Sequence, residues 1–384
     1  MNNSLQKYSS MAIFTHTQYR NHKPVHGPCD DILDFMKTYF DGEIIYLSHS
    51  IYKGNGSVLE IYQNDQLQLF KKNNFSKDFP NVLRYMMDLI VTFIWFIPRK
   101  PVGLVVAADP LNFLYAYVLK SLKKVDKIVY YSLDYAYRRF DNFVLNKIYH
   151  LLDLFAVKKS NLIWNACVKI REVRRMQGVH DRENIHLPNT PILHGVGIKK
   201  EKEIDKFSLV NIFSNHKQVD FGIMFKVLSR LIEHFPEITL KLIGRGDFAK
   251  EVMSQIKDSR IRGHIKFMDI SSHIEALEEI SRCAIGLECN TQSLCWNEFR
   301  EPIKIMEYIT FGLPIISKPG HALVDEILKE KIGFIVRDEN EMFRAVASLL
   351  GNPNYYSQVR QRVLNLAKNQ NKTRILYNSL SQLN

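Results

Sequence analysis

Compact apolar runs alternate with amphipathic stretches along the first half of the chain. Residues 11–15, 103–108 and 127–133 are short and apolar, which predicts buried strands of a parallel sheet. Residues 111–123 and 144–157 repeat apolar positions at helical spacing. Further strands are expected at 43–48, 161–165 and 184–187, a hairpin at 58–70 and a helix at 29–40. This alternation of strands and helices is typical of a doubly wound parallel sheet.

The pattern restarts after a charged segment at residues 195–206, which predicts an interdomain linker. Expected strands follow at 209–213, 238–243, 265–268, 283–287, 313–316 and 334–336, and terminal helices at 341–350 and 355–367. A chain of 384 residues suits two domains of ordinary size. We expect residues 1–198 and 199–366 to form two Rossmann-like α/β domains that face each other across a cleft, with 367–384 packing back on the first.

A polar loop, a short helix, a glycine and a buried strand are predicted in that order within residues 297–317. Pro302 suits the first helical turn, where its missing N–H would have no partner, and Gly312 suits the helix C-terminus. Glu307 is unusual because it places a carboxylate in the middle of a short apolar helix. A short helix after a loop at the carboxyl end of a strand lies where open α/β sheets bind ligands, which favours a nucleotide site.

The charge of the chain indicates an anionic partner. The 52 Lys and Arg residues outnumber the 40 Asp and Glu residues, which gives a formal net charge of +12. This excess favours a nucleotide, an anionic membrane surface or nucleic acid. Nucleic acid ranks last, because the basic residues are interleaved with acids and carry no nucleic-acid motif. The five cysteines are scattered, which predicts plain thiols in a reducing compartment and no zinc site.

Residues 86–98 form the most apolar window, which includes Asp88 and is too short to span a bilayer. A buried helix is the favoured interpretation, and the alternative is a helix that rests on a membrane with Arg99 and Lys100 at its rim. A second basic and aromatic group presents the same choice between solvated helix ends and an anionic membrane surface: Tyr115, Tyr117, Lys120, Lys123 and Lys124. Residues 1–10 lack the apolar run of a signal peptide, so we expect a cytoplasmic protein, with peripheral attachment to the inner face of the membrane left open.

Four motifs follow one another between residues 209 and 336. They are residues 210–220, the turn Gly244-Arg245-Gly246, residues 302–314, which read Pro-x-Lys-x-x-Glu-Tyr and then Gly-x-Pro, and the ending Gly333-Phe334-Ile335-Val336. Together they resemble the family 4 retaining glycosyltransferases of the GT-B fold. The first motif keeps the family's lysine and aspartate as Lys217 and Asp220, but Ile212 stands in place of its arginine. The resemblance is weaker in the first half, where Leu133-Asp134 stands for the family's His-Asp and a single Gly27 for a glycine pair.

The resemblance implies that the second domain binds a nucleoside diphosphate sugar. Glu307 would bond the ribose diol, while Lys217 and Lys304 would contact the donor phosphates, where a fixed cation stabilises the departing group. The other donor-binding residues that we expect are Gly244, Arg245 and Pro302. Each assignment has a plainer alternative, as a surface glutamate, a solvated lysine or a turn residue. The sugar-contacting glutamate of the family aligns with Phe299, and we expect Glu301 to replace it.

The same resemblance implies that the first domain binds the acceptor. Asp134, at the end of a predicted strand, would orient hydroxyl groups or would merely cap the following turn. Gly27 and Asp30 would contact sugar hydroxyls or would only begin a helix. Arg138, in the loop after Asp134, is counted with these acceptor-binding residues.

The implied function is transfer of a hexose, with retention of configuration, to a saccharide or a lipid-linked saccharide. Lys217, Glu301 and Asp134 would be the catalytic residues, and the leaving phosphate would take the proton of the acceptor. No Asp-x-Asp motif occurs, so we expect neither a metal ion nor a cofactor besides the donor. The departures from the family at Ile212, Phe299 and Leu133 leave open a nucleotide-binding module without catalysis.

Overall fold

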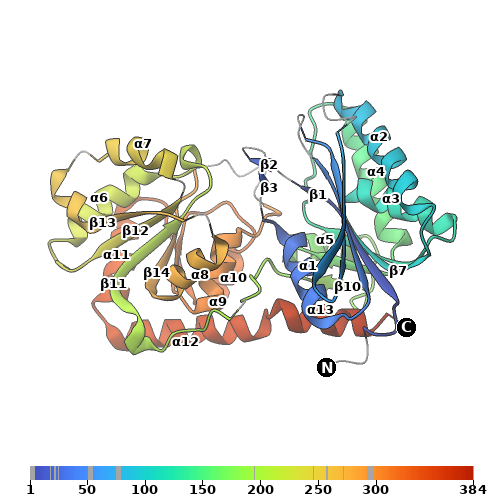
Figure 1. Cartoon of the computed structure of the whole chain (residues 1–384). Coiled ribbons are helices and arrows are strands. Elements are labelled where there is room, and N and C mark those ends of the chain that lie inside the picture. Colours follow the sequence, from blue (N-terminus) through green and yellow to red (C-terminus); the bar gives the residue numbers. More distant parts are fainter. Residues whose placement is uncertain are drawn as a thin grey trace. The chain divides into compact units, whose positions relative to one another are not determined.

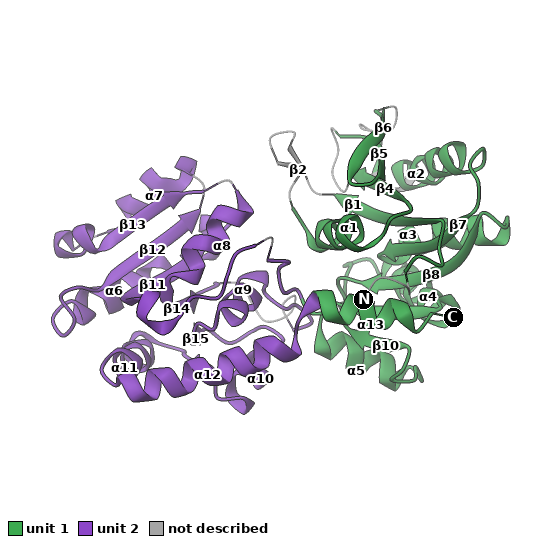
Figure 2. Cartoon of the chain, turned by 60° about the horizontal axis from the view of Figure 1, so that its bottom comes forward, with its two compact units in different colours: residues 1–188, 373–384 green, residues 189–372 purple. Residues whose placement is uncertain are grey.

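The computed structural model separates the chain into two compact units, shown in Figures 1 and 2. Unit 1 comprises residues 1–188 and 373–384, and unit 2 comprises residues 189–372. The charged segment 195–206, which the sequence suggested as a linker, lies within unit 2. The structure describes residues 5–17, 19–20, 23–24, 26–50, 55–74, 79–193, 195–244, 246–256, 258–270, 272–291 and 298–383.

Unit 1 is built on an eight-stranded sheet with the order β10-β9-β8-β7-β1-β4-β5-β6. Its strands are β1 Ser10–Thr17, β4 Glu43–Ser50, β5 Ser57–Gln63, β6 Gln66–Asn73, β7 Val102–Ala108, β8 Val125–Ser132, β9 Leu162–Asn165 and β10 Asn184–His186. Strands β5 and β6 form the antiparallel hairpin predicted from the sequence. Strand β5 is also antiparallel to β4, and the other pairs are parallel. Every residue of β7 is buried, as expected for a parallel strand with helices on both faces. A separate antiparallel pair joins β2 Tyr19–Arg20 and β3 Lys23–Pro24.

Within the described part of unit 1 the helices are α1 Pro28–Tyr39, α2 Asn81–Phe96, α3 Pro110–Ser121, α4 Phe143–Lys159, α5 Val168–Met176 and most of α13 Lys372–Ser381. In Figure 1, α2, α3 and α4 cover one face of the sheet, and α1, α5 and α13 lie on the other. The indole of Trp164 in β9 donates a hydrogen bond of 3.1 Å to Ser379 Oγ, which fastens α13 to this sheet. The sequence reading did not identify α5 or α13.

Unit 2 is built on a six-stranded parallel sheet with the order β13-β12-β11-β14-β15-β16. Its strands are β11 Asp205–Ile212, β12 Thr239–Gly244, β13 Ile265–Asp269, β14 Cys283–Glu288, β15 Ile315–Ser317 and β16 Gly333–Ile335. The seven helices are α6 Phe221–Leu231, α7 Ala249–Ser254, α8 His273–Ser281, α9 Ile303–Phe311, α10 Val324–Lys329, α11 Glu339–Leu350 and α12 Pro353–Asn369, among the residues that the structure describes. Short 3₁₀ turns occur at Glu201–Glu203, His216–Gln218, Gly246–Phe248 and Ser259–His264.

Helix α9 follows the sequence prediction with one correction at its start. Pro302 caps the helix from outside with an extended conformation, and the first helical residue is Ile303. Gly312 ends the helix with a φ of +77°, in the left-handed region where a side chain would be strained. The buried Arg360 donates hydrogen bonds to the carbonyl oxygens of Phe311 and Gly312, which would otherwise have no partner at the helix end.

Each sheet contains a point at which the strand order reverses. In unit 2 the chain adds β12 and β13 on one side of β11 and then returns to its other side with β14. In unit 1 the chain adds β4, β5 and β6 on one side of β1 and returns to its other side with β7. The loops at the carboxyl ends of β11 and β14, and of β1 and β7, therefore diverge and leave room for a ligand.

Helix α2 corrects the favoured interpretation of residues 86–98 as a buried helix. Val91 and Phe96 are buried, but Met86, Ile90 and Ile94 are exposed on the opposite side of the helix. A helical spacing in the sequence shows that apolar residues share a face without showing whether that face turns inward.

The four cysteines that lie in the described ranges are buried free thiols: Cys29, Cys167, Cys283 and Cys289. Cys295 lies outside the described residues.

Candidate functional site

The switch point of unit 2 is framed by two loops that are bonded to each other. The loop after β11 contains Lys217 and ends at Asp220, whose carboxylate caps α6 through the backbone N–H of Ile223. The N–H of Asp220 donates to the carbonyl of Cys289, directly after β14, over 2.8 Å. Val219 also forms an isolated β-bridge with Asn290. The Lys217 loop is therefore held against the strand on the far side of the switch point.

Charged side chains converge at this edge of the sheet. Lys304 of α9 pairs with Glu288 at the end of β14 over 2.8 Å, and Lys318 after β15 pairs with Asp220 over 2.6 Å. The backbone N–H of Lys318 also donates to the carbonyl of Glu288. Burial, followed by the charge of Glu288, raises the pKa of the Cys289 thiol to about 12. The charges of Lys318, Asp220 and Lys304 also act on the pKa of this thiol.

Glu307 is buried on α9, so the alternative of a surface glutamate does not hold. Its residue is 5% exposed, and its Oε1 lies 2.8 Å from Nε2 of His273, the first residue of α8. The next residue, Tyr308, is fully buried, and its hydroxyl accepts from the N–H of Ile212 at the end of β11. The Tyr308 ring also fills the space beside Gly286, where a side chain would clash. Helix α9 is thereby fixed across both strands of the switch point, and Glu307 with it.

The other donor-site residues expected from the sequence have different surroundings. Lys217 is exposed, and Asn215 accepts a hydrogen bond from its backbone N–H. Gly244 packs against the ring of Phe213, which leaves no space for a side chain. Glu301 is buried beside the start of α9, and Asn189 donates to its backbone carbonyl. Arg245 lies outside the described residues.

The acceptor-site residues expected in unit 1 do not gather in one place. Asp30 accepts hydrogen bonds from the N–H of Gly27 and from the hydroxyl of Tyr46. Gly27 and Asp30 therefore lie together at the start of α1. Burial raises the pKa of the Asp30 carboxyl. Asp134 and Arg138 lie instead in the loop after β8, where both are exposed and Arg138 pairs with Asp141.

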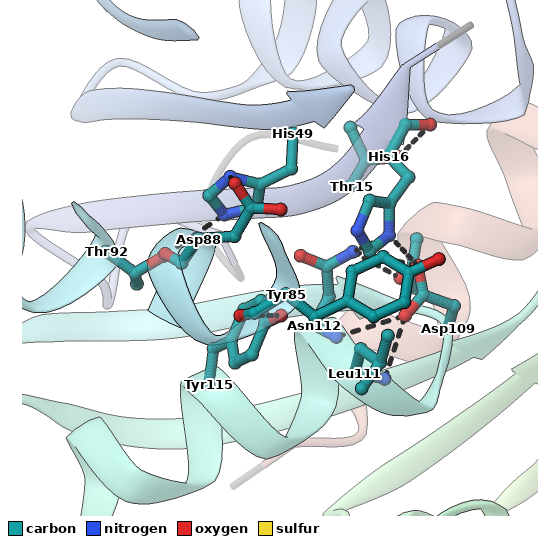
Figure 3. Close-up of polar contacts among 11 residues, drawn as sticks. Thr15, His16, His49, Tyr85, Asp88, Thr92, Asp109, Leu111, Asn112 and Tyr115 are labelled. Carbon is teal, nitrogen blue, oxygen red and sulfur yellow. Dashed lines mark hydrogen bonds and ion pairs between the residues drawn. The ribbon is translucent and has the colours of Figure 1, made fainter. Parts of the chain in front are cut away.

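The switch point of unit 1 carries a polar cluster that the sequence reading missed (Figure 3). His16 near the end of β1 and Asp109 directly after β7 meet through Nδ1 and Oδ2 at 2.5 Å. Asn112 of α3 donates to the same Asp109 oxygen over 2.8 Å and to the carbonyl of Ala108. Nε2 of His16 is buried and has no hydrogen-bond partner among the residues that the structure describes. An imidazole fixed by a carboxylate at one nitrogen can accept a proton at the other.

Asp109 occupies a strained backbone conformation. Its φ of +77° and ψ of 163° fall in a region that is essentially restricted to glycine. The other carboxylate oxygen accepts from the N–H groups of Leu111 and Asn112, so the residue also caps α3. Such strain costs on the order of 1–3 kcal/mol and persists where the surrounding structure holds the residue in place. In this strained conformation the Asp109 carboxylate contacts His16 with one oxygen and caps the start of α3 with the other.

The ionisation of the pair follows from its contacts. Burial alone lowers the pKa of the His16 imidazole, but the charge and hydrogen bond of Asp109 outweigh burial, so this pKa lies above its ordinary value. Burial alone raises the pKa of the Asp109 carboxyl, but His16 and Asn112 outweigh burial and lower it.

A second imidazole, that of His49, lies beside His16 with a ring separation of 5.9 Å. It is bonded through Nδ1 to Ser57 and through Nε2 to Thr92. Burial lowers the pKa of His49, so this histidine supports the cluster in its neutral form.

The sequence contained a signal for this cluster. His16 directly follows the predicted strand 11–15, and Asp109-Pro110 directly follows the predicted strand 103–108. Carboxyl ends of parallel strands share one edge of a sheet, but only the strand order shows that β1 and β7 are neighbours.

No group of three or more His, Cys, Asp or Glu side chains within the described ranges has the arrangement of a metal site. No helix in the same ranges is long and apolar enough to cross a membrane.

Comparisons with known proteins agree on the architecture. No family model matches the chain. A Haemophilus influenzae protein described as an uncharacterized glycosyltransferase is 25% identical over 145 residues, which is 37% of this chain and 39% of that protein. The matched part is thus less than half of that relative.

Solved structures match over nearly the whole chain. Sucrose-phosphate synthase from Thermosynechococcus elongatus has a TM-score of 0.68 at 11% identity and covers 98% of this chain and 99% of its own. Anabaena HepE in complex with UDP has a TM-score of 0.66 at 11% identity, and the match covers 97% of this chain and 98% of the HepE chain. These likenesses show that the chain has the GT-B fold, as the resemblance in sequence predicted.

Proposed function

We propose that this protein is a glycosyltransferase that binds a nucleoside diphosphate sugar at the switch point of unit 2. The observation that carries the proposal is the buried Glu307 on α9. Lys304 of the same helix pairs with Glu288 at the end of β14, and Lys318 after β15 pairs with Asp220 in the loop after β11. A carboxylate can accept from both hydroxyls of a ribose, and lysines suit phosphate oxygens. The glycosyltransferase with a matching segment and the UDP-bound neighbour of the same fold support this assignment.

Lys217 is the residue proposed to act on the transition state. As the bond between the anomeric carbon and the phosphate oxygen breaks, its electron pair leaves with the diphosphate, and negative charge grows there. Lys217 is exposed and forms no ion pair with the residues that the structure describes, while Lys304 and Lys318 are paired with carboxylates. Lys217 can therefore approach the leaving group without breaking a contact of that kind. A cation placed there stabilises the transition state more than the bound donor.

Retention of configuration and independence from metal ions are carried into the proposal from the resemblance. The acceptor oxygen would then attack the face that the diphosphate leaves, and the leaving phosphate would take its proton. Glu301 would contact the donor sugar, and Asp134 would orient a hydroxyl group. The acceptor is proposed to be a saccharide or a lipid-linked saccharide, at the cytoplasmic face of a membrane.

The His16–Asp109 pair favours a second mechanism, in which configuration is inverted. His16 Nε2 would take the proton of the acceptor hydroxyl as its oxygen bonds to the anomeric carbon, and the electron pair of the breaking bond would leave with the diphosphate. Asp109 would stabilise the imidazolium that forms. The anomeric configuration of the product, read by NMR immediately after transfer, separates the two mechanisms.

The proposed donor site is tested by nucleotide binding to the full chain. Glu307→Gln should weaken binding of UDP, or of whichever nucleoside diphosphate in a panel binds best, by about 10- to 100-fold, because one charged hydrogen-bond acceptor is lost. Glu275→Gln, an exposed change in the first turn of α8, is the matched control and should bind normally. Glu301→Gln should keep nucleotide binding and lose transfer.

Two outcomes would overturn the proposal. Equal nucleotide affinity in Glu307→Gln and in the Glu275→Gln control would remove Glu307 from the site. Nucleotide binding without release of diphosphate from any nucleotide sugar, with any acceptor offered, would leave a binding module without catalysis.

A further inference from the structure

Helix α2 exposes its apolar side and buries its charged side. The large hydrophobic residues on its outer face and at its C-terminus are 44% to 63% exposed: Leu83, Met86, Ile90, Ile94 and Ile97. Its two charged residues, Arg84 and Asp88, are each only 2% exposed. Ser57 donates a hydrogen bond to Asp88 from within the unit. A surface helix normally has the reverse arrangement, with the apolar face packed on the core.

Helix α4 carries a second exposed apolar group in the same layer. Phe143, Val144, Leu145, Ile148 and Leu151 are 44% to 77% exposed. Helix α3 packs against both α2 and α4, and all three lie on one face of the unit 1 sheet (Figure 1). Phe96 of α2 and Ala156 of α4 face the core on the opposite side, so both exposed groups point away from the sheet. We call the outer faces of these helices the α2–α4 surface.

The charges on this surface have one sign. The three helices contain only two acidic residues, Asp88 and Asp153, and both are buried. Asp153 pairs with the buried Arg174. The exposed charges of α4 are those of Lys147, Lys158 and Lys159. The surface is therefore apolar with a positive contribution and without an exposed carboxylate on these helices.

A hollow of ≈ 380 Å³ adjoins the outer face of α2. Lys71 and Lys72 of β6 line it together with Val91, Ile94 and Trp95 of α2. An aromatic side chain between an apolar face and two exposed lysines is the combination found where a protein meets lipid headgroups.

We propose that the α2–α4 surface lays unit 1 on an anionic lipid bilayer, with its apolar side chains at the boundary between headgroups and acyl chains. Lys71 and Lys72 contact lipid phosphates beside Trp95 in this arrangement. A second copy of the chain is a poorer occupant, because two such surfaces in contact would oppose lysines without acidic partners from these helices. This surface differs from the basic and aromatic group around Tyr115 that the sequence suggested as a membrane contact. Tyr115 is buried, and its hydroxyl donates a hydrogen bond to the carbonyl of Tyr85.

The contact has a consequence that rests on the proposed function. A membrane-bound enzyme searches for a lipid-linked acceptor in two dimensions, with the sheet of unit 1 held close to the bilayer. Binding of unit 1 to lipid requires neither the donor nor Glu307.

Co-sedimentation of the full chain with phosphatidylcholine vesicles, with and without phosphatidylglycerol, tests the proposal. We expect binding to the anionic vesicles that weakens in high salt, and at least about tenfold weaker binding to the neutral ones. Ile90→Ser combined with Ile94→Ser should weaken anionic-vesicle binding by about 10- to 100-fold. Lys71→Ala combined with Lys72→Ala should weaken it by about 30-fold, from roughly 1 kcal/mol per lysine.

Matched changes in unit 2 are the controls. Leu328→Ser replaces an equally exposed apolar side chain, and Lys226→Ala replaces an exposed lysine. Both should bind vesicles like the unchanged protein, and all variants should keep the same unfolding midpoint and nucleotide affinity. If the unchanged protein binds nucleotide normally but does not bind vesicles, the lipid proposal is wrong and the proposed donor site is unaffected.

Two further results would overturn the proposal. Vesicle binding that survives the Ile90/Ile94 and the Lys71/Lys72 changes would place the membrane contact elsewhere. A dimer in light scattering that the Ile90/Ile94 change dissociates, without vesicle binding by the unchanged protein, would assign the surface to a second copy.

Discussion

The two switch points of this molecule have the same topology and different chemistry. The switch point of unit 2 combines lysines with a buried glutamate, a set that suits phosphates and a ribose. The switch point of unit 1 centres on His16, Asp109 and Asn112, a set that suits a hydroxyl group and its proton. The sheet therefore decides where a ligand can bind, and the side chains at the strand ends decide which chemical class binds there.

The backbone shows the same contrast. Gly312 in unit 2 and Asp109 in unit 1 both have a φ of +77°. Gly312 adopts this conformation at little cost, whereas Asp109 is strained and is held by contacts to α3 and His16. Strain therefore marks the switch point where an imidazole must be oriented.

The largest expected effect concerns the cation at the unit 2 switch point. Lys217→Met should slow transfer by about 10²- to 10³-fold, because charge on the departing diphosphate loses its stabilisation. Nucleotide affinity should change much less, since the charge grows only during reaction. Lys226→Met, on the exposed side of α6, is the control, and initial rates with a nucleotide sugar provide the measurement. Equal losses in rate and in affinity would show that Lys217 serves binding alone.

A smaller effect is expected from the glycine that ends α9. Gly312→Ala should lower the free energy of unfolding by about 1–3 kcal/mol, because of the left-handed φ and a close approach to Leu364. Gly263→Ala is the control, because the space around Gly263 is open and its φ is not positive. Chemical denaturation of the full chain measures both variants. An unchanged stability in Gly312→Ala would mean that the helix end adjusts without strain.

The smallest expected effect is on the ionisation of His16. Asp109→Asn keeps a side-chain oxygen that can cap α3, and asparagine tolerates positive φ better than most residues. Without the carboxylate charge, burial should bring the pKa of His16 below its ordinary value of 6.5. An NMR titration measures this pKa, with His16→Gln to identify the signal. A pKa that stays above 6.5 in Asp109→Asn would assign the shift to another group.

The same pair predicts how stability depends on pH. The pKa of His16 is raised on folding, so its contribution is complete below 6.5 and is lost as pH rises through the folded value. The pKa of Asp109 is lowered on folding, so its contribution is present above 3.8 and is lost as pH falls through the folded value. Between about pH 5 and about pH 8, Asp109→Asn should therefore show a smaller fall in stability than the unchanged chain.

Much of the fold could be predicted from the sequence because most elements carry their own signal. The run 103–108 predicted the fully buried β7, and the stretch 297–317 predicted α9, its terminal glycine and β15. Helix α5 was not predicted because it is only nine residues long and four of them are Lys or Arg, which leaves few apolar positions to show a period. Helix α13 was not predicted from the sequence because its packing partner, Trp164, lies more than 200 residues away in the chain.

The candidate site could be predicted only in part. The motifs located Glu307, Lys304 and Lys217, because these residues lie within one continuous region of the sequence. The environment of Glu307 was not predictable, since His273 reaches it from another helix. Gly27 and Asp30 were predicted either to contact sugar hydroxyls or only to begin a helix. In the structure they are bonded to each other at the start of α1.

The sequence by itself determined the alternation of strands and helices, the end of α9 and the positions of the carboxylate and lysines of the proposed donor site. Those features depend on residues close together in the chain, so local periodicity and spacing encode them. Only the tertiary structure decided the strand order, and the strand order placed His16 beside Asp109 across 93 residues. Only the tertiary structure also decided that α2 turns its charges inward and its isoleucines outward, because hydrophobic spacing is the same whichever way a helix faces.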